Sequence, residues 1–434
     1  MATPAAPSQA PSRSPTRVLR HRNYRLLWMG SVGATLGASI GNVIINWVVY
    51  SATHNPLAIT ALGVVGFLPT LTFGIYAGAL IDRWDRRRLM VNCNIGRAVS
   101  YGGLAVSVLV IGVNLPVVLV CIFATATLGT LSRPASNALL PRLLPSQDMT
   151  DGNGLLQAGQ TAAGFVGSPL GGVVLVVGAA LVGAQAGPSL GLGINGATEA
   201  LAGALIALMV ISPRGSGEPK KERESGSLTS DVREGMRFLR TQEALLTITL
   251  LAMVANFFIS MFNAYEVVYV VDRLHLGATA FGALLAAATL GFGIGGLLPG
   301  RLGADRAPGI WAGAGWGAAG LPIIVLALTA SFVPALLSLF AWSCLLSVGQ
   351  TAWLSAAQRT VPDKFLGRYF ALDEAGSFAM IPAGQVVGGL TILAFGVSRS
   401  FLIAGLGASI SSFAMLASPA VRAWARSVKP STSA

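Results

Sequence analysis

Only 11% of the 434 residues are charged, whereas 53% are hydrophobic. Soluble domains carry about 25% charged residues, so this composition excludes an ordinary soluble protein. The net charge of +12 would indicate a nucleic-acid partner only if the basic residues formed one surface patch, but they fall in the gaps between long apolar runs. We therefore expect an all-α polytopic membrane protein that binds no nucleic acid.

The chain opens with a tail, residues 1–24, whose Pro, Ser and Arg content is typical of a disordered segment. Apolar runs long enough to cross a bilayer then follow one another almost to the end of the chain. We expect twelve membrane-spanning helices, at 25–52, 57–81, 89–112, 116–139, 154–182, 190–212, 244–270, 278–299, 309–329, 333–357, 367–394 and 398–421.

One polar segment, 213–243, is much longer than the other gaps and separates six runs from six. The chain therefore divides into a first six-helix half at 25–212, this linker, a second six-helix half at 244–422 and a short tail at 423–434. Within the linker, residues 228–240 carry apolar side chains at helical spacing between arginines, which predicts an amphipathic helix. A structural strap between the halves is favoured over a regulatory element.

The basic residues give the orientation of the spans. Placing the N-terminus in the cytoplasm puts 25 of the 29 Lys and Arg residues on the cytoplasmic side, as the positive-inside rule requires. We therefore expect a multi-pass protein of a bacterial cell membrane with both termini and the linker in the cytoplasm.

The gap between the second and third runs reads GALIDRWDRRR, residues 78–88. This stretch resembles the signature loop of the major facilitator superfamily, roughly G-x-L-a-D-R-x-G-R-R-x-x-L. Asp85 replaces the second glycine of the signature and Met90 its last leucine, while six positions match in register: Gly78, Leu80, Asp82, Arg83, Arg86 and Arg87. The stretches RNYRLLWMGS, SRPASNALLPRLLP and VPDKFLGR support the resemblance, which is greatest to the bacterial exporter branch with macrolide efflux pumps and the enterobactin exporter.

The resemblance implies a gate at the cytoplasmic edge. In this family the aspartate of the loop is thought to hold the first half against the eleventh span, which assigns Asp82 to a latch and Arg83 and Arg86 to its ion-pair network. Asp373 and Glu374 are candidate partners. Some arginines of the loop also serve as a topology signal. The expected gating residues are Gly78, Asp82, Arg83, Arg86, Arg133, Arg368, Asp373 and Glu374.

The fifth run contains GFVGSPLGG, residues 164–172, which resembles the antiporter motif of the family with its proline one position late. Glycines let helices approach closely, and a proline kinks a helix and frees a carbonyl. The eleventh run repeats this design in IPAGQVVGG. We expect Gly164, Pro169, Gly171 and Pro382 to serve kinking and packing, which suits two halves that rock about a site between them; ordinary glycine-rich packing is the alternative.

Polar and aromatic side chains follow one face of several runs. In this family the first and fourth helices of each half border the central cavity, and polar faces of spanning helices must point toward protein or water. Such faces suit a cavity for an amphiphilic organic molecule, although hydrogen bonds between helices explain single members equally well. The expected cavity residues are Asn42, Asn46, Asn256, Phe257, Asn263, Tyr265, Tyr269, Ser347 and Gln350.

Ionisable residues inside spans are candidates for function, because a charge in lipid is costly and is rarely kept without a role. Glu266, beside two tyrosines in a helix expected to border the cavity, is the first choice for a proton carrier, and Glu199 is the second. A structural pair with a neighbouring polar group is the alternative for both.

No phosphate-binding glycine loop, metal-ligand cluster or nucleophile arrangement occurs in the sequence. We therefore expect neither an enzyme nor a cofactor. The favoured function is a monomeric, proton-driven exporter of small amphiphilic compounds or drugs. The alternatives are a dedicated siderophore or metabolite exporter and, in a different class, a sensor or lipid-handling protein with the same fold.

Overall fold

The computed structural model of the protein describes residues 15–81, 85–145, 148–183, 186–210 and 228–424. These segments are almost entirely helical and contain no β-strand. Long helices of the first part are α1 (Arg22–Thr53), α2 (Pro56–Ile81), α3 (Arg86–Ile111), α4 (Leu115–Leu139), α5 (Met149–Val182) and α6 (Ala186–Ala207).

The second part of the chain begins with a short helix, α7 (Leu228–Thr241), and continues with longer ones. These are α8 (Glu243–Asn263), α10 (Ala278–Arg301), α11 (Pro308–Leu328), α12 (Phe332–Thr360), α13 (Asp363–Phe378) and α14 (Ile381–Ala414). Between α8 and α10 the chain forms a single turn, α9 (Glu266–Val268), and a π-helical turn, η4 (Tyr269–Arg273); α15 (Pro419–Ala423) ends the described chain.

Eleven helical segments of the described residues are long and apolar enough to cross a membrane. The last of them covers 50 residues, Arg368–Ala417, which at 1.5 Å per residue would be about 75 Å, more than twice the thickness of a hydrocarbon core. Gly396 interrupts it with φ 79° and ψ 166°, a conformation that glycine adopts readily. The hydroxyls of Thr391 and Ser400, on either side of this residue, are 2.8 Å apart. The chain therefore reverses direction at Gly396, which confirms the expected twelve spans.

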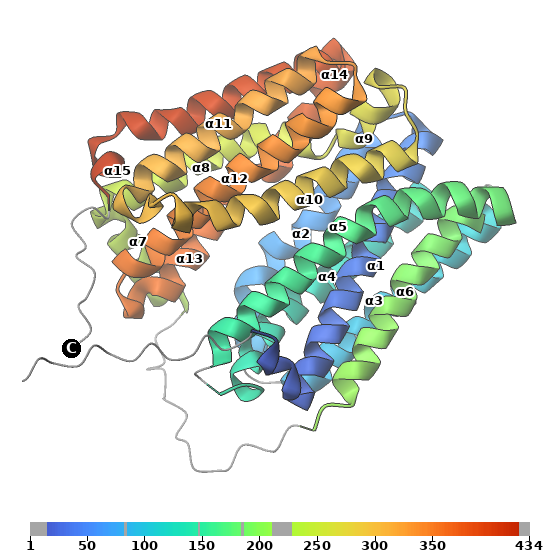
Figure 1. Cartoon of the computed structure of the whole chain (residues 1–434), viewed down its shortest axis with the longest axis horizontal. Helices are drawn as coiled ribbons and strands as arrows, with labels where there is room; N and C mark the ends of the chain where they lie inside the picture. Colours follow the sequence, from blue (N-terminus) through green and yellow to red (C-terminus); the bar gives the residue numbers. More distant parts are fainter. Residues whose placement is uncertain (1–14, 82–84, 146–147, 184–185, 211–227, 425–434) are drawn as a thin grey trace, which may run out of the picture.

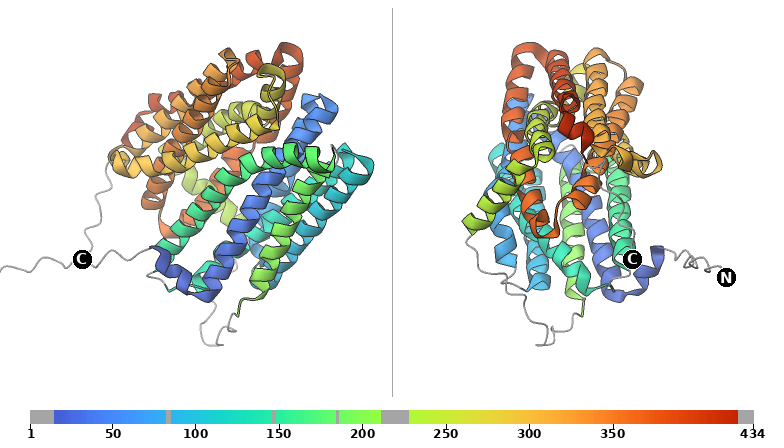
Figure 2. Two further views of the ribbon diagram at one scale, coloured as in Figure 1. Left: turned by 45° about the vertical axis from the view of Figure 1, so that its right-hand side comes forward. Right: turned by 90° about the vertical axis from the view of Figure 1, so that its left-hand side faces the viewer.

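The helices form two bundles, one of α1–α6 and one of α8–α14 (Figure 1). In the first bundle α1 packs on α5 and α6, α3 on α4 and α6, and α2 on α4. In the second, α14 packs on α8 and α11, and α12 on α10 and α11. The bundles meet where α5 contacts α10 and where α2 contacts α14, and both views of Figure 2 show them side by side.

The molecule has two distinguishable ends. One end carries the brief connections that follow α1, α3, α5, η4, α11 and the first part of α14; we call it the short-loop end. The opposite end carries the connections after α2, α4, α6, α10 and α12, among them the long linker that follows α6, and we call it the linker end. Polar side chains cap the starts of two helices: Asp85 accepts a hydrogen bond from the Arg88 amide at the start of α3, and Asn114 accepts one from the Val117 amide at the start of α4.

Candidate functional site

One close approach between the bundles, that of α5 and α10, depends on glycine. A Cβ atom placed on Gly172 of α5 would lie 2.5 Å from the carbonyl oxygen of Ala278 in α10. A Cβ on Gly282 of α10 would lie 2.5 Å from the carbonyl oxygen of Ser168. Any larger residue at either position would separate the two backbones, because a contact of this length is essentially never observed for a real Cβ.

The glycine run of α5, residues 164–172, also packs closely against α1. A Cβ on Gly167 would lie 2.8 Å from the carbonyl oxygen of Leu36, and one on Gly171 would lie 2.9 Å from that of Ile40. Gly164 faces Thr289 of α10 and the Ser39 hydroxyl of α1. The motif around Pro169 therefore lies between one helix of its own bundle and one helix of the other. Pro169 itself is inside α5, whereas Pro382 follows the break between α13 and α14.

A second junction is built on Tyr265, which is fully buried where α8 ends. Its hydroxyl lies 2.6 Å from the Thr60 hydroxyl of α2 in the other bundle. It also donates a hydrogen bond to the carbonyl oxygen of Gln385 in α14. Tyr265 thus joins three helices from both bundles, and it contributes to the boundary between them as a buried, hydrogen-bonded residue.

A third junction lies at the tips of α1 and η4. The Tyr50 hydroxyl donates a hydrogen bond of 2.5 Å to Oδ2 of Asp272. Tyr50 is only 2% exposed, and Asp272 belongs to the π-helical turn, a rare geometry that is frequent at functional sites. Two hydrogen bonds between described side chains join the bundles, this one and that of Thr60 with Tyr265, and both are at the short-loop end. The protein is therefore held together at that end by breakable, non-covalent contacts.

The expected cavity residues fall into two groups. In the first, Asn42 is exposed and Asn46 is partly buried, with its amide donating to the Asn42 carbonyl of the same helix. Asn263 is exposed, and Phe257 and Gln350 are partly buried. These side chains are therefore exposed or partly buried, and their place in a cavity stays a prediction.

The second group serves packing within the second bundle. The Asn256 amide donates a hydrogen bond of 2.9 Å to the carbonyl oxygen of Ser377. The Tyr269 hydroxyl donates one of 3.2 Å to the Thr329 carbonyl. Ser347 is buried opposite Gly296, in the contact between α12 and α10. For these positions the structure shows the helix–helix contacts that the sequence left open as an alternative.

The two intramembrane glutamates differ in their surroundings. The Glu199 carboxylate is completely buried and lies 2.6 Å from the Arg97 guanidinium, so it forms an ion pair between α6 and α3 inside one bundle. Glu266 is 6% exposed and begins α9, directly after Tyr265. Its carboxylate makes no hydrogen bond or ion pair with any described residue. Burial without a partner is costly for a charged carboxylate.

The expected gate at the linker end is described only in part. Asp82 and Arg83 lie outside the described residues, as do the surroundings of Gly78 and the side chain of Arg133. Among the remaining members, Arg86 is partly buried and Glu374 is exposed.

Arg368 and Asp373 both have partners in the second part of the chain. The Arg368 guanidinium donates a hydrogen bond of 2.6 Å to Glu234 of α7. Asp373 is buried, and its Oδ1 accepts a hydrogen bond of 2.5 Å from the Thr249 hydroxyl of α8. The contacts that the structure describes for these two residues thus run to α7 and α8 and not to the first bundle.

Reasoning from the sequence alone missed three residues at these contacts and the partner of a fourth. Tyr50, Thr60 and Asp272 stand at the ends of spans, where polar residues are common and carry no special signal. Arg97 lies inside the third apolar run, where the sequence shows its charge but not its partner. Only the packing of α3 on α6 brings it to Glu199.

Comparison with known proteins places this geometry among transporters. The family model described as Major Facilitator Superfamily matches residues 27–384. Macrolide efflux protein A of Streptococcus pyogenes is 22% identical over 400 residues, covering 89% of this chain and 94% of the relative. The multidrug efflux pump Tap of Mycolicibacterium fortuitum is 25% identical over 277 residues, covering 61% of this chain and 64% of the pump.

Solved structures show the same fold at low identity. The nucleoside transporter NupG superposes with a TM-score of 0.74 at 11% identity, covering 91% of this chain and 99% of that one. A bacterial homolog of the human lysosomal transporter Spinster, in an inward-facing and unoccupied conformation, superposes with a TM-score of 0.66 at 16% identity, covering 93% and 97%. At these identities the likeness concerns the fold alone.

Proposed function

Because the chain belongs to the major facilitator superfamily, we propose that it is a secondary active exporter that moves small amphiphilic organic compounds in exchange for protons. The names of two relatives, a macrolide efflux protein and a multidrug efflux pump, support this class of cargo. Transport would proceed by alternating access, in which the two bundles open first at one end and then at the other.

The observation that carries the proposal is the construction of the short-loop end. Glycine contacts between α5 and α10 and the two hydrogen bonds of Tyr50 and Tyr265 close this end. Such contacts are individually weak, about 0.5–1.5 kcal/mol for a typical hydrogen bond, so the bundles can separate there during a transport cycle. A closure made of small surfaces and single hydrogen bonds is what alternating access requires.

The distribution of the basic residues supports an orientation of the protein in the membrane. Twenty-five of the 29 basic residues belong to the linker end or to the two tails, which supports a cytoplasmic location for that end. With this orientation the described conformation is closed toward the outside, as an exporter is when it takes up cargo from the cytoplasm.

Proton coupling is proposed to use Glu266. Its neighbour Tyr265 contacts Thr60 of the first bundle, so opening the short-loop end breaks this contact and alters the surroundings of the adjacent carboxyl group. A carboxyl group without a cationic partner can exchange a proton as its access to water changes. Glu199 is the weaker choice, because its ion pair with Arg97 lies within one bundle.

The test is transport by the purified protein in liposomes. A panel of macrolides and other amphiphilic drugs is offered with and without an imposed pH gradient, and uptake into the proteoliposomes is measured. We expect accumulation of at least one compound that depends on the gradient and disappears with a protonophore. Uptake that is equal with and without the gradient would contradict proton exchange, and uptake of no compound would contradict the drug class.

A further inference from the structure

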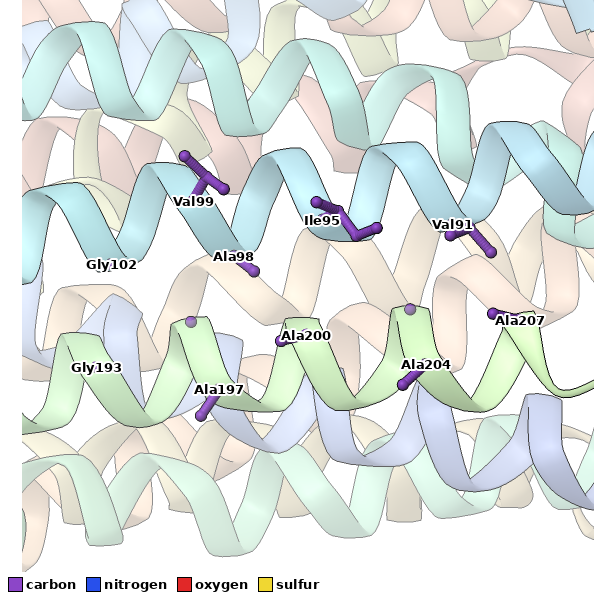
Figure 3. A pocket seen from close by; sticks show the side chains of 12 residues that line it. Val91, Ile95, Ala98, Val99, Gly102, Gly193, Ala197, Ala200, Ala204 and Ala207 are labelled. Atoms are coloured by element: carbon purple, nitrogen blue, oxygen red, sulfur yellow. The ribbon is translucent and has the colours of Figure 1, made fainter.

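A groove runs along the outer surface of the first bundle between α3 and α6. These two helices lie on the side of that bundle that faces away from the second one (Figure 1). The groove encloses about 560 Å³ between Val91–Gly102 of α3 and Gly193–Ala207 of α6, and its lining consists of Val, Ile, Ala and Gly. Figure 3 shows the side chains of both helices along it. No polar side chain among the lining residues offers a site for water.

The groove arises because α6 carries small residues on this face. Elsewhere on its surface α6 presents large side chains, such as Leu190 and Leu201, which are 50% and 55% exposed. Between α6 and α3 it presents Ala197, Ala200 and Ala204 instead, which leave the space open. A void inside a bilayer would lose the dispersion contacts of its whole lining, and the lining gives water no hydrogen bonds. An apolar occupant therefore fills this space.

The length of the groove corresponds to one leaflet. Eleven residue steps of α3 and fourteen of α6 give about 16 and 21 Å at 1.5 Å per residue, against about 30 Å for a whole hydrocarbon core. The groove starts at the linker end, where α6 finishes with Ala207. An extended acyl chain anchored at that surface reaches along most of it.

Positive charge lies at the linker end of the groove. Arg87 and Arg88 precede the lining residue Val91 by one turn of α3. The Arg87 guanidinium donates hydrogen bonds to the carbonyl oxygens of Ile206, at 3.2 Å, and of Ala207, so it lies where α6 ends. Arg88 is exposed. Basic clusters beside a spanning helix attract anionic lipid headgroups, with about 1 kcal/mol for each basic residue near the surface.

We propose that this groove binds one acyl chain of an anionic phospholipid whose phosphate group lies against Arg87 and Arg88. The lipid is a bound ligand of the transporter and not its cargo. A second copy of the chain is the other apolar partner that small residues on α6 would suit. A two-fold dimer through this face, however, would bring the same arginines of both copies together, and like charges oppose such contacts. The charge at the groove therefore favours the lipid.

The test measures lipids retained by the purified full-length protein in native mass spectrometry. Phosphatidylglycerol and phosphatidylcholine are added in equal amounts. Ala204→Phe fills the groove and should abolish the preferentially retained phosphatidylglycerol, whereas Leu201→Phe, on the exposed face of the same helix, should keep it. Arg88→Gln should lower the preference for phosphatidylglycerol about fivefold, which corresponds to the ~1 kcal/mol of one basic residue. Arg422→Gln, which changes an exposed arginine of α15, should leave that preference unchanged.

A cross-linking measurement on the unmodified protein makes the result independent of variant folding. Phosphatidylglycerol with a diazirine on its acyl chain should label peptides that contain Val91–Gly102 and Gly193–Ala207 more than other lipid-facing helices. Equal labelling of all exposed helices, or equal lipid retention by Ala204→Phe and Leu201→Phe, would overturn the proposal. A dimer that dissociates only in Ala204→Phe would assign the groove to a second copy. None of these measurements involves transport, so they stand or fall separately from the proposed function.

Discussion

Glu266 and Tyr265 are adjacent in the chain but have different partners. The Tyr265 hydroxyl contacts Thr60 in the opposite bundle, whereas the Glu266 carboxylate has no described partner. In the proposed function, a residue that contacts the opposite bundle and the residue that would exchange the proton are thus joined by one peptide bond. This adjacency gives a physical route by which opening of the short-loop end would change proton binding.

Replacing Glu266 by Gln tests this route. The amide preserves size and hydrogen-bonding capacity but cannot titrate, so we expect gradient-driven accumulation of cargo to be lost while downhill exchange persists. Uptake with and without a pH gradient in proteoliposomes measures both. Glu243→Gln is the matched control, because Glu243 begins the same span and is exposed. If Glu266→Gln still concentrates cargo, the proton is carried elsewhere.

A second prediction at the scale of single residues concerns Tyr50. Tyr50→Phe removes the hydrogen bond to Asp272, a loss of about 1 kcal/mol that should favour the state open at the short-loop end about fivefold. Spin labels on cysteines at Ala52 and Leu276, which lie in different bundles, report the two states as a short and a long distance.

The control for this experiment is Tyr24→Phe. The Tyr24 hydroxyl donates to the Gly152 carbonyl within the first bundle, so its loss should leave the distance distribution unchanged. An unchanged distribution in Tyr50→Phe as well would show that Tyr50 and Asp272 do not contribute to closure.

At the scale of elements, the close contact between α5 and α10 depends on glycines, which have no side chain. From the sequence we expected the glycine run to allow close packing of helices, but the sequence did not show which helix would be the partner. Gly171 contacts α1, whereas the adjacent Gly172 contacts α10 of the other bundle. Consecutive residues on a helix point about 100° apart, which allows one motif to serve both contacts.

Gly172→Val is expected to prevent closure of the short-loop end, because the new Cβ would collide with the backbone of α10. The protein should then populate the long distance between the labels at positions 52 and 276 and lose transport. Gly154→Val, also in α5 but with open space around its Cβ position, is the control for the lower helix propensity of valine. Normal closure in Gly172→Val would mean that α5 and α10 are not a tight junction in the membrane.

The helix α7 shows how a linker can be tied to one bundle. Besides the ion pair of Glu234 with Arg368, the rings of Phe238 and Phe365 stack at 4.5 Å between centroids. Leu239 is 3% exposed. In Figure 1 α7 lies beside α13, the helix that begins the eleventh span. The contacts therefore attach α7 to the second bundle, and its role as a strap between the halves stays a prediction.

For the whole molecule, hydropathy was sufficient to predict the spans, because lipid requires each span to be a long apolar helix. The turn at Gly396 lies between the expected eleventh and twelfth spans, although the helices on either side are nearly continuous. Contacts between spans were not predictable in this way. The pairing of Arg97 with Glu199 and of Tyr50 with Asp272 depends on rotation and tilt of helices, to which hydropathy is insensitive.

The orientation of the whole molecule yields the last prediction. If the linker end is cytoplasmic, single cysteines at Ser51, near the end of α1, and at Glu243, at the start of α8, lie on opposite sides of the membrane. Both positions are exposed, so both thiols should react in permeabilised cells. In intact cells an impermeant maleimide should label only the cysteine at position 51. Two of the natural cysteines, Cys93 and Cys121, are buried, and the unmodified protein gives the background, including that of Cys344. Labelling at position 243 in intact cells would reverse the orientation, and the conformation described here would then be closed toward the cytoplasm.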